Sequence, residues 1–378
     1  MSQRKVFEEV ADATRAAPAA KPGLISRGRE RGSRAIRVWL MVLFVMVAAM
    51  VLIGGLTRLT DSGLSITEWD LVKGTLPPMN MADWQEAYAK YQTSPEFRFQ
   101  NNYMKLEDFK TIYWWEWSHR FLGRMVGLVW AVGFLFFWLS RRIPTGWTGR
   151  LAGIGLLGGL QGAIGWWMVS SGLTGRMVDV ASYRLATHLG LAFIILGLIA
   201  WYVLSLRMGE AERMRARRAG EAGLKRLAGL VLGLAFLQIL LGALVAGIDA
   251  GRSFIDWPWM AGQFLPPDPF ELTPLWSNFF ENPGLVQFIH RCVGYTLVLA
   301  VLYAWLRARR SPNRATRNAF TYVAIMALIQ MSLGILTVLY AAPLDIASTH
   351  QLGAMVLWVL IIAARHQTTY PVTQSIRG

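Results

Sequence analysis

The chain has 378 residues, of which 54% are hydrophobic and only 16% are charged, and its mean hydropathy is positive. A soluble protein of this length would carry charge on about a quarter of its residues. The composition therefore excludes an ordinary soluble protein. The formal net charge of +15 could indicate a nucleic-acid partner, and the positions of the charged residues distinguish this from a membrane topology signal.

Eight apolar stretches are long enough to cross a bilayer, which takes roughly 20 helical residues. They are residues 36–57, 118–140, 149–171, 182–206, 225–247, 285–306, 319–341 and 345–365. Backbone polar groups inside lipid must be satisfied within the segment, so each stretch is predicted to be a helix. The predicted fold class is an all-α integral membrane protein with eight transmembrane helices.

Basic residues are concentrated in alternate connections. Nine Lys and Arg residues lie in the N-terminal part up to Arg37, and three, seven and five lie at 141–150, 207–226 and 307–317. The connections between them lean acidic, with nine acidic and six basic residues at 58–117 and five and one at 249–284. The positive-inside rule then predicts that both termini are cytoplasmic. The basic excess is a topology signal close to anionic headgroups, and no nucleic-acid partner is expected.

The chain contains an internal repeat. Its matching segments are GGLTRLTDSG (54–63) with GALVAGIDAG (242–251), SHRFLG (118–123) with IHRCVG (289–294), LQGAIG (160–165) with IQMSLG (329–334), and ATHLG (186–190) with STHQLG (348–353). Because the matches keep their order, we expect two tandem four-helix bundles in the same orientation. Such parallel repeats are expected to be related by a pseudo-two-fold axis along the membrane normal.

Four of the five histidines occupy equivalent places in this repeat, near the start of an even-numbered helix and opposite the basic loops: His119, His188, His290 and His350. In a four-helix bundle the second and fourth helices can face each other across the core, and two opposed imidazoles suit bis-histidine haem. Zinc would need three or four protein ligands. A single histidine at a helix end is more often interfacial, but the fourfold pattern favours ligation. His366 has no counterpart and is expected to be interfacial.

The neighbours of the first histidine in each half differ in an informative way. Arg120 and Arg291 directly follow it, where a guanidinium can pair with haem propionates or extend to lipid headgroups. Three residues before it stands Glu116 in the first half and Gln287 in the second. A carboxylate beside a haem face can move protons. The alternative is a charge that is stabilised by the helix macrodipole near an N-terminus.

The predicted organisation has five consecutive parts, and the second of them contains a long loop. They are a disordered cytoplasmic tail (1–35), an N-terminal half (36–206) that includes a long extracytoplasmic loop (58–117), a basic linker (207–224), a C-terminal half (225–366) and a cytoplasmic tail (367–378). The long loop has helical, aromatic-rich character, typical of a lid or of an interfacial belt. The lone Cys292 excludes a disulfide within the chain and any cysteine metal cluster.

Several motifs in order resemble haem A synthase, the membrane enzyme of cytochrome oxidase assembly, in the class of α-proteobacteria and mitochondria. They are GGLTRLTDSGLSITEWDLVKGTLPPM, EWSHRFLGRMVG, QGAIGWWMVSSGL, ATHLGLA, IHRCVGY and STHQLGA. The resemblance covers nearly the whole chain after the tail. Some bacterial members carry a cysteine pair in the outer loops, and this sequence has none there, so a thiol-based role is not expected.

The resemblance implies an enzyme of the bacterial inner membrane that oxidises the C8 methyl of haem O to a formyl group, with water as the oxygen source. It assigns His290 and His350 to a resident haem b, and His119 and His188 to the substrate haem O, with Glu116 as a catalytic residue. It also implies transient contact with haem O synthase and an electron acceptor that the sequence does not identify. The sequence leaves open whether the protein forms a homo-oligomer. The residues alone leave two other classes open: a dihaem electron-transfer cytochrome b and a non-enzymatic haem carrier.

Overall fold

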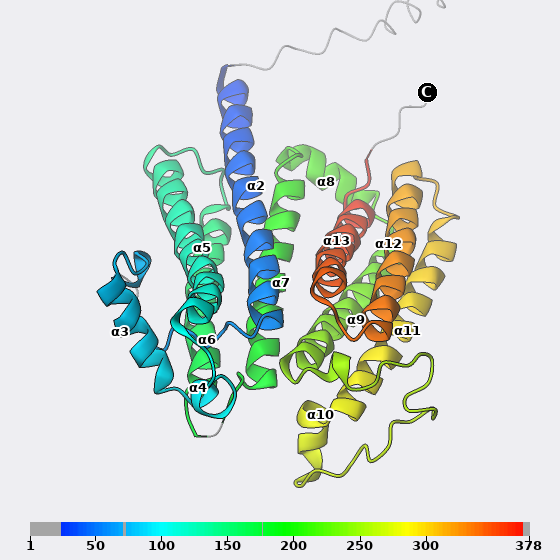
Figure 1. Cartoon of the computed structure of the whole chain (residues 1–378). Coiled ribbons are helices and arrows are strands. Elements are labelled where there is room, and N and C mark those ends of the chain that lie inside the picture. The colour runs from blue at the N-terminus through cyan, green and yellow to red at the C-terminus, as the bar shows by residue number, and fades with distance from the viewer. Residues whose placement is uncertain (1–23, 71–72, 176, 373–378) are drawn as a thin grey trace, which may run out of the picture.

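The computed structural model describes residues 24–70, 73–175 and 177–372, which form helices and loops without a β-strand (Figure 1). Eight of these helices are long and apolar enough to span a membrane. They are α2 (Leu24–Leu59), α5 (Leu106–Leu139), α6 (Thr148–Gly172), α7 (Ser182–Ser205), α9 (Ala222–Gly247), α11 (Pro283–Ala308), α12 (Arg314–Leu339) and α13 (Leu344–Thr369). The prediction of an all-helical, multi-pass membrane chain is confirmed.

Most helix boundaries lie within a few residues of the predicted spans, and the starts of α2 and α5 are the exceptions. Helix α5 is the more informative of the two. It begins at Leu106 rather than near residue 118, so the last part of the predicted outer loop is helical. Most of the predicted N-terminal tail, residues 1–23, lies outside the described residues, and its remainder is already helical from Leu24. The basic linker contains the short helix α8 (Glu210–Arg218).

The eight long helices pack as two rings of four. In the N-terminal ring the order of contacts is α2–α5–α6–α7, and in the C-terminal ring it is α9–α11–α12–α13, each ring closing on its first helix. The rings meet where α7 and α13 lie against each other and against α9 and α2. At this interface the Trp358 indole of α13 donates a 2.9 Å hydrogen bond to the backbone oxygen of Phe193 in α7. Ile362 of α13 also lies against Gly197 of α7 at this interface.

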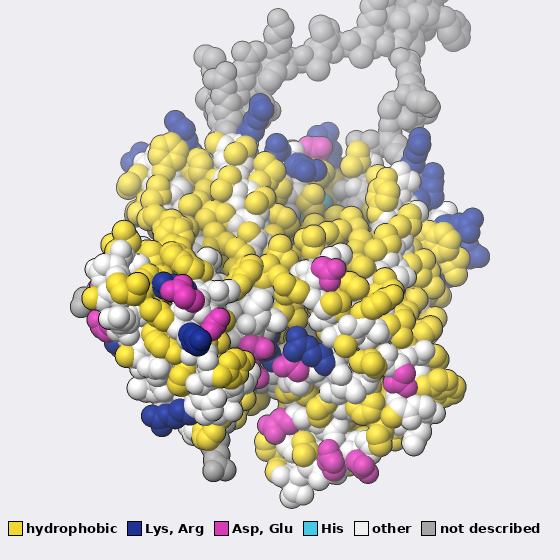
Figure 2. All heavy atoms as spheres, in the orientation of Figure 1, with side chains coloured by type: hydrophobic (Ala, Val, Ile, Leu, Met, Phe, Trp, Pro, Cys, Tyr) yellow, Lys and Arg dark blue, Asp and Glu magenta, His cyan; other side chains and the backbone are white. Residues whose placement is uncertain are grey.

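The two ends of the bundle differ in character. Helix α2 begins and α13 ends at one end, whereas α3 (Met81–Gln92), α4 (Pro95–Phe99) and α10 (Asn278–Glu281) lie at the other end (Figure 1). Figure 2 shows Lys and Arg side chains gathered at the end where α2 begins, a hydrophobic middle, and most Asp and Glu side chains toward the opposite end. This distribution agrees with the alternation of charge along the sequence.

The first turns of α5 are held by a small folded unit rather than by other spans. Helices α3 and α4 pack on α5 through the buried side chains of Tyr91, Phe109, Ile112 and Tyr113. Ser94 caps α4 by accepting a hydrogen bond from the backbone nitrogen of Phe97. The long loop therefore has its own hydrophobic core, and α5 projects into it beyond the apolar middle of the bundle.

Replacement of Phe109 by alanine should loosen this outer unit without disturbing the rings. Phe109 is fully buried, and truncation of a buried phenylalanine costs about 3–5 kcal/mol. We expect faster proteolysis of residues 60–105 in the detergent-solubilised protein. Phe99→Ala is the matched control, because Phe99 is 58% exposed in the same unit. Equal protease resistance of the two variants would contradict the packing described here.

Candidate active site

Each ring brings two of the predicted histidines together. His119 of α5 and His188 of α7 lie close enough to interact electrostatically, as do His290 of α11 and His350 of α13. In both rings these are the second and fourth helices, as the repeat predicts. All four side chains are only partly buried, although they lie on membrane-spanning helices. The imidazoles therefore border space that the protein's own atoms do not fill.

Every one of these imidazoles lies against a glycine of the neighbouring helix. A Cβ atom added at the glycine would lie about 3 Å from the histidine Cε1, closer than real side chains normally pack. The four pairs are Gly54 with His119 (2.8 Å), Gly165 with His188 (2.9 Å), Gly242 with His290 (3.1 Å) and Gly334 with His350 (3.0 Å). We call these four residues the cradle glycines. The absence of a side chain at each of them is what lets the ring approach the adjacent helix.

Two glutamines orient the second histidine of each ring. The Gln161 amide nitrogen lies 3.2 Å from Nδ1 of His188 and donates to the backbone oxygen of the same residue at 2.9 Å. Gln330 makes the same two contacts with His350, at 3.2 and 2.8 Å. The amide nitrogen can only donate, so Nδ1 is the acceptor in this contact, and the bond to the backbone oxygen fixes each glutamine beside its imidazole. The sequence analysis missed both glutamines, although the aligned segments LQGAIG and IQMSLG carry them in register.

The first histidine of each ring has a different environment. Nδ1 of His119 and of His290 is buried and, among the described residues, has no hydrogen-bond partner. Gln238 of α9 lies 3.3 Å from Nε2 of His290. The repeat places Met50 at the corresponding position of α2, where its Cε methyl lies near Gly123. The C-terminal ring is thus more polar beside its first imidazole than the N-terminal ring.

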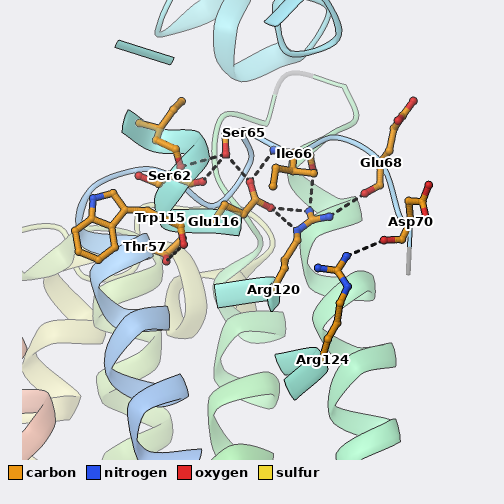
Figure 3. Close-up of polar contacts among 11 residues, drawn as sticks. Thr57, Ser62, Ser65, Ile66, Glu68, Asp70, Trp115, Glu116, Arg120 and Arg124 are labelled. Atoms are coloured by element: carbon orange, nitrogen blue, oxygen red, sulfur yellow. Dashed lines mark hydrogen bonds and ion pairs between the residues drawn. The ribbon is translucent and has the colours of Figure 1, made fainter. Parts of the chain in front are cut away.

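Glu116 lies within α5, is 3% exposed and accepts four hydrogen bonds (Figure 3). Arg120 donates to Oε1 through Nε (3.0 Å) and Nη2 (2.6 Å), while the Ser65 hydroxyl and the backbone nitrogen of Ile66 donate to Oε2, both at 2.7 Å. The macrodipole alternative for this residue is wrong, because α5 begins at Leu106 and the effect fades within the first turn. Glu116 instead fastens the loop after α2 to α5.

We call residues 65–70 the N-terminal strap. Besides Glu116, it is fastened by Arg120, which donates to the backbone oxygens of Ile66 (2.6 Å) and Glu68 (2.8 Å). Arg124, one turn further along α5, donates to the backbone oxygen of Asp70 at 2.7 Å. Trp69 packs on Trp166 of α6, with 5.1 Å between ring centroids. The strap therefore joins α5 to α6 beside the cradle glycine Gly165.

The corresponding strap of the C-terminal ring, residues 254–259, uses the same three positions on α11. Gln287 donates to the backbone oxygen of Phe254 and accepts from Arg291, both at 3.1 Å. Arg291 also donates to the backbone oxygens of Phe254 and Trp259 at 3.0 Å. Tyr295, at the position of Arg124, accepts a 2.8 Å hydrogen bond from the Trp257 indole. The carboxylate is replaced by an amide, and Arg124, the deeper arginine, by a tyrosine.

The donor set fits haem rather than a bare metal ion. Among the described residues, no group of three or more His, Cys, Asp or Glu side chains could hold a metal ion. Two opposed imidazoles are sufficient for haem iron, because the porphyrin supplies the other ligands. The partly exposed imidazoles and the cradle glycines give such a planar group a place between the helices.

The remaining histidine and the cysteine lie apart from these sites. His366 is buried rather than interfacial, with its ring against Trp201 and Tyr370. Cys292 carries a free, partly buried thiol.

Comparison with known proteins agrees with this arrangement. Residues 37–362 match the COX15-CtaA family model, described as cytochrome oxidase assembly protein. Proteins named heme A synthase from Ruegeria pomeroyi, Dinoroseobacter shibae and Paracoccus denitrificans are 60%, 59% and 58% identical to the chain. The alignments cover 100% of this chain and 100%, 98% and 99% of those proteins. The chain therefore belongs to the COX15-CtaA family of cytochrome oxidase assembly proteins and, within it, to the haem A synthases.

Proposed function

We propose that this chain oxidises the C8 methyl group of haem O to a formyl group and so produces haem A for cytochrome oxidase. The reaction proceeds by successive hydroxylations, with water as the oxygen source, and ends with loss of water from a gem-diol. One observation supports this function above all. Each ring has a pair of imidazoles that lie against glycines at equivalent positions. Only the N-terminal ring has a carboxylate one turn from its first histidine.

In this proposal His290 and His350 hold a resident haem b, and His119 and His188 bind the iron of haem O. Haem b, when bound, supplies a one-electron redox centre. The arginines support this division. Nε of Arg291 is buried and has no partner among the described residues, so a permanent haem propionate can accept its hydrogen bond. Four of the five N–H groups of Arg120 already donate to Glu116 or to the strap, so a substrate propionate that binds through two N–H groups must displace one of those acceptors.

This displacement gives Glu116 a way to act. Its two oxygens accept four hydrogen bonds, which is about the capacity of a carboxylate. A propionate that draws Arg120 away frees Oε1, and the free oxygen can accept a proton or stabilise positive charge at the C8 carbon. Oε1 of Glu116 would then be free to act as a base only when substrate is bound.

The proposal also orients the molecule. The Lys- and Arg-rich end at which α2 begins faces the cytoplasm, so both termini are cytoplasmic and the straps face outward from the bacterial inner membrane. The matching order of contacts in the two rings supports a pseudo-two-fold axis along the membrane normal. Haem O carries a farnesyl chain, so its transfer from haem O synthase within the membrane avoids exposure of that chain to water.

Chromatography of extracted haems tests the function. The purified protein, co-expressed with haem O synthase in a host that makes no haem A, should contain haem b together with haem A or a hydroxylated intermediate. His290→Ala and His350→Ala should lose the resident haem b absorption. His119→Ala and His188→Ala should keep it and yield no haem A. Two haem b per chain in the unmodified protein, despite available haem O, would instead support an electron-transfer cytochrome.

The cradle glycines can be tested with a matched control on the same helix. Gly165→Ala places a methyl group 2.9 Å from Cε1 of His188, whereas nothing lies within 4 Å of a Cβ at Gly162. We expect Gly165→Ala to lower haem A yield by about tenfold and to leave haem b in place, since a misplacement of about 1 Å can cost roughly 100-fold. Gly162→Ala should resemble the unmodified protein. An equal effect of the two substitutions on haem A yield would refute a specific contact with the imidazole.

Glu116→Gln should preserve folding and haem b but block conversion of haem O. The amide can still accept from Arg120, as Gln287 does from Arg291, but its nitrogen cannot accept from Ile66. Ser65→Ala separates charge from loop anchoring, because it removes one donor and leaves the carboxylate. We expect Ser65→Ala to retain substantial haem A formation. Comparable loss in the two variants would mean that Glu116 acts only as an anchor for the strap.

A further inference from the structure

A second buried carboxyl group lies in the outer unit near Glu116. Glu96, in α4, is 2% exposed and packs within the aromatic core of that unit. It is hydrogen-bonded to the Tyr91 hydroxyl, which also accepts a 2.8 Å hydrogen bond from the Asn101 amide. The other carboxyl oxygen, Oε2, is buried and has no hydrogen-bond partner among the described residues. If Glu96 is ionised, Oε2 needs a hydrogen-bond donor, and if Oε2 is protonated, it needs an acceptor. The structure supplies neither partner among the described residues.

The surroundings of Glu96 favour the protonated form. Burial raises the pKa of Glu96 to about 8, and the carboxylates of Glu116, Asp179 and Asp61 add to the rise, whereas the Tyr91 hydrogen bond opposes it. A group with such a pKa exchanges its proton near neutral pH, unlike an ordinary surface glutamate.

Glu96 lies near Glu116 and near a group of acidic residues around Arg58. It interacts electrostatically with Glu116, Asp61 and Asp179. Arg58, at the end of α2, is 2.7 Å from Asp61, 3.6 Å from Asp179 and 2.7 Å from Asp249 of the C-terminal ring. All three carboxylates are more than a third exposed, and burial raises the pKa of Asp179 to about 6. Arg252 also lies 3.5 Å from Asp249, so two guanidinium groups face three carboxylates and the group keeps a net negative charge that favours uptake of a proton.

The proposed reaction requires such capacity. Each hydroxylation of a methyl carbon by water releases two electrons and two protons. The electrons go to the acceptor of the reaction, and the protons need a base near the reacting methyl group. Glu116 lies beside the reacting group but cannot pass protons to Arg120, because a guanidinium only donates hydrogen bonds.

We infer that Glu96 receives the protons released beside Glu116 and passes them to Asp61 and Asp179 at the outer rim. This inference rests on the proposed function. The step moves protons only: an O–H bond forms at Oε2 of Glu96 as one breaks at Glu116 or at a water molecule, and the reverse exchange follows toward Asp179. Ordered water is the usual link between buried polar groups that do not touch.

The test uses the purified holoenzyme and two readouts, infrared absorption of protonated carboxyl groups and the pH profile of haem A formation. In the unmodified protein turnover should rise with pH through about 8, as Glu96 becomes able to accept a proton. Glu96→Gln should remove both the carboxyl band that titrates there and this limb of the profile. It should lower turnover at least about tenfold, within the range for loss of proton transfer, and keep haem b. Glu107→Gln, at an exposed carboxylate of the same unit, is the control and should change neither readout.

Tyr91→Phe provides a second variant that retains the carboxyl group. Removal of the Tyr91 hydrogen bond should raise the pKa of Glu96 further and move the limb to more alkaline pH, which a purely structural role would not do. If Glu96→Gln removes the carboxyl band and leaves turnover and its pH profile unchanged, the proton-transfer role is wrong and the proposed function stands. If the unmodified protein makes no haem A, the proposed function itself fails.

Discussion

The structure depends on one constraint: each imidazole within the membrane bundle has to approach the backbone of the neighbouring helix closely. The four cradle glycines meet this constraint in the same way in both rings. A small residue at a helix contact lets side chain and backbone approach closely, which is how membrane helices commonly pack. The spacing of the helices in each ring is thus tied to the position of its histidines. The outer straps, which are fastened to the same helices, are placed in turn by that spacing.

The sequence predicts this framework better than its details. The repeat identified the four histidines as equivalent and revealed the exchange of Glu116 for Gln287, because both features follow from counting along helices. It carried Gln161 and Gln330 in register as well, and a search for polar residues four positions before the cradle glycines would have found them. The early start of α5 was also visible in part, since Glu107 and Asp108 suit a first helical turn.

Glu96 could not have been found in the same way. Nothing in the segment TSPEF marks its glutamate as buried, and an isolated glutamate in an outer loop is normally solvated. Its burial results from the tertiary packing of α3 and α4 on α5 around Tyr91 and Phe109. The strap contacts could not be predicted from the sequence either, because they join side chains of α5 to backbone groups far earlier in the chain. Arg120, for example, donates to the backbone oxygen of Ile66, which lies 54 residues before it. Residue spacing along the chain predicts which helix residues act as ligands. Which groups surround those ligands is determined by how the loops fold.

In the proposed function, the differences between the rings follow the difference between a resident group and a substrate. A cofactor that stays in place is served by fixed neutral contacts, such as those of Gln238, Gln287 and Tyr295 in the C-terminal ring. A substrate that enters and leaves needs contacts that can be exchanged. The N-terminal ring has Met50 in place of Gln238, and two arginines fasten its strap where the C-terminal ring has one, so an anionic substrate has more donors to compete for. Exchange of partners at Arg120 would link the arrival of haem O to the release of Glu116, so that the carboxylate becomes available only when there is a methyl group to oxidise.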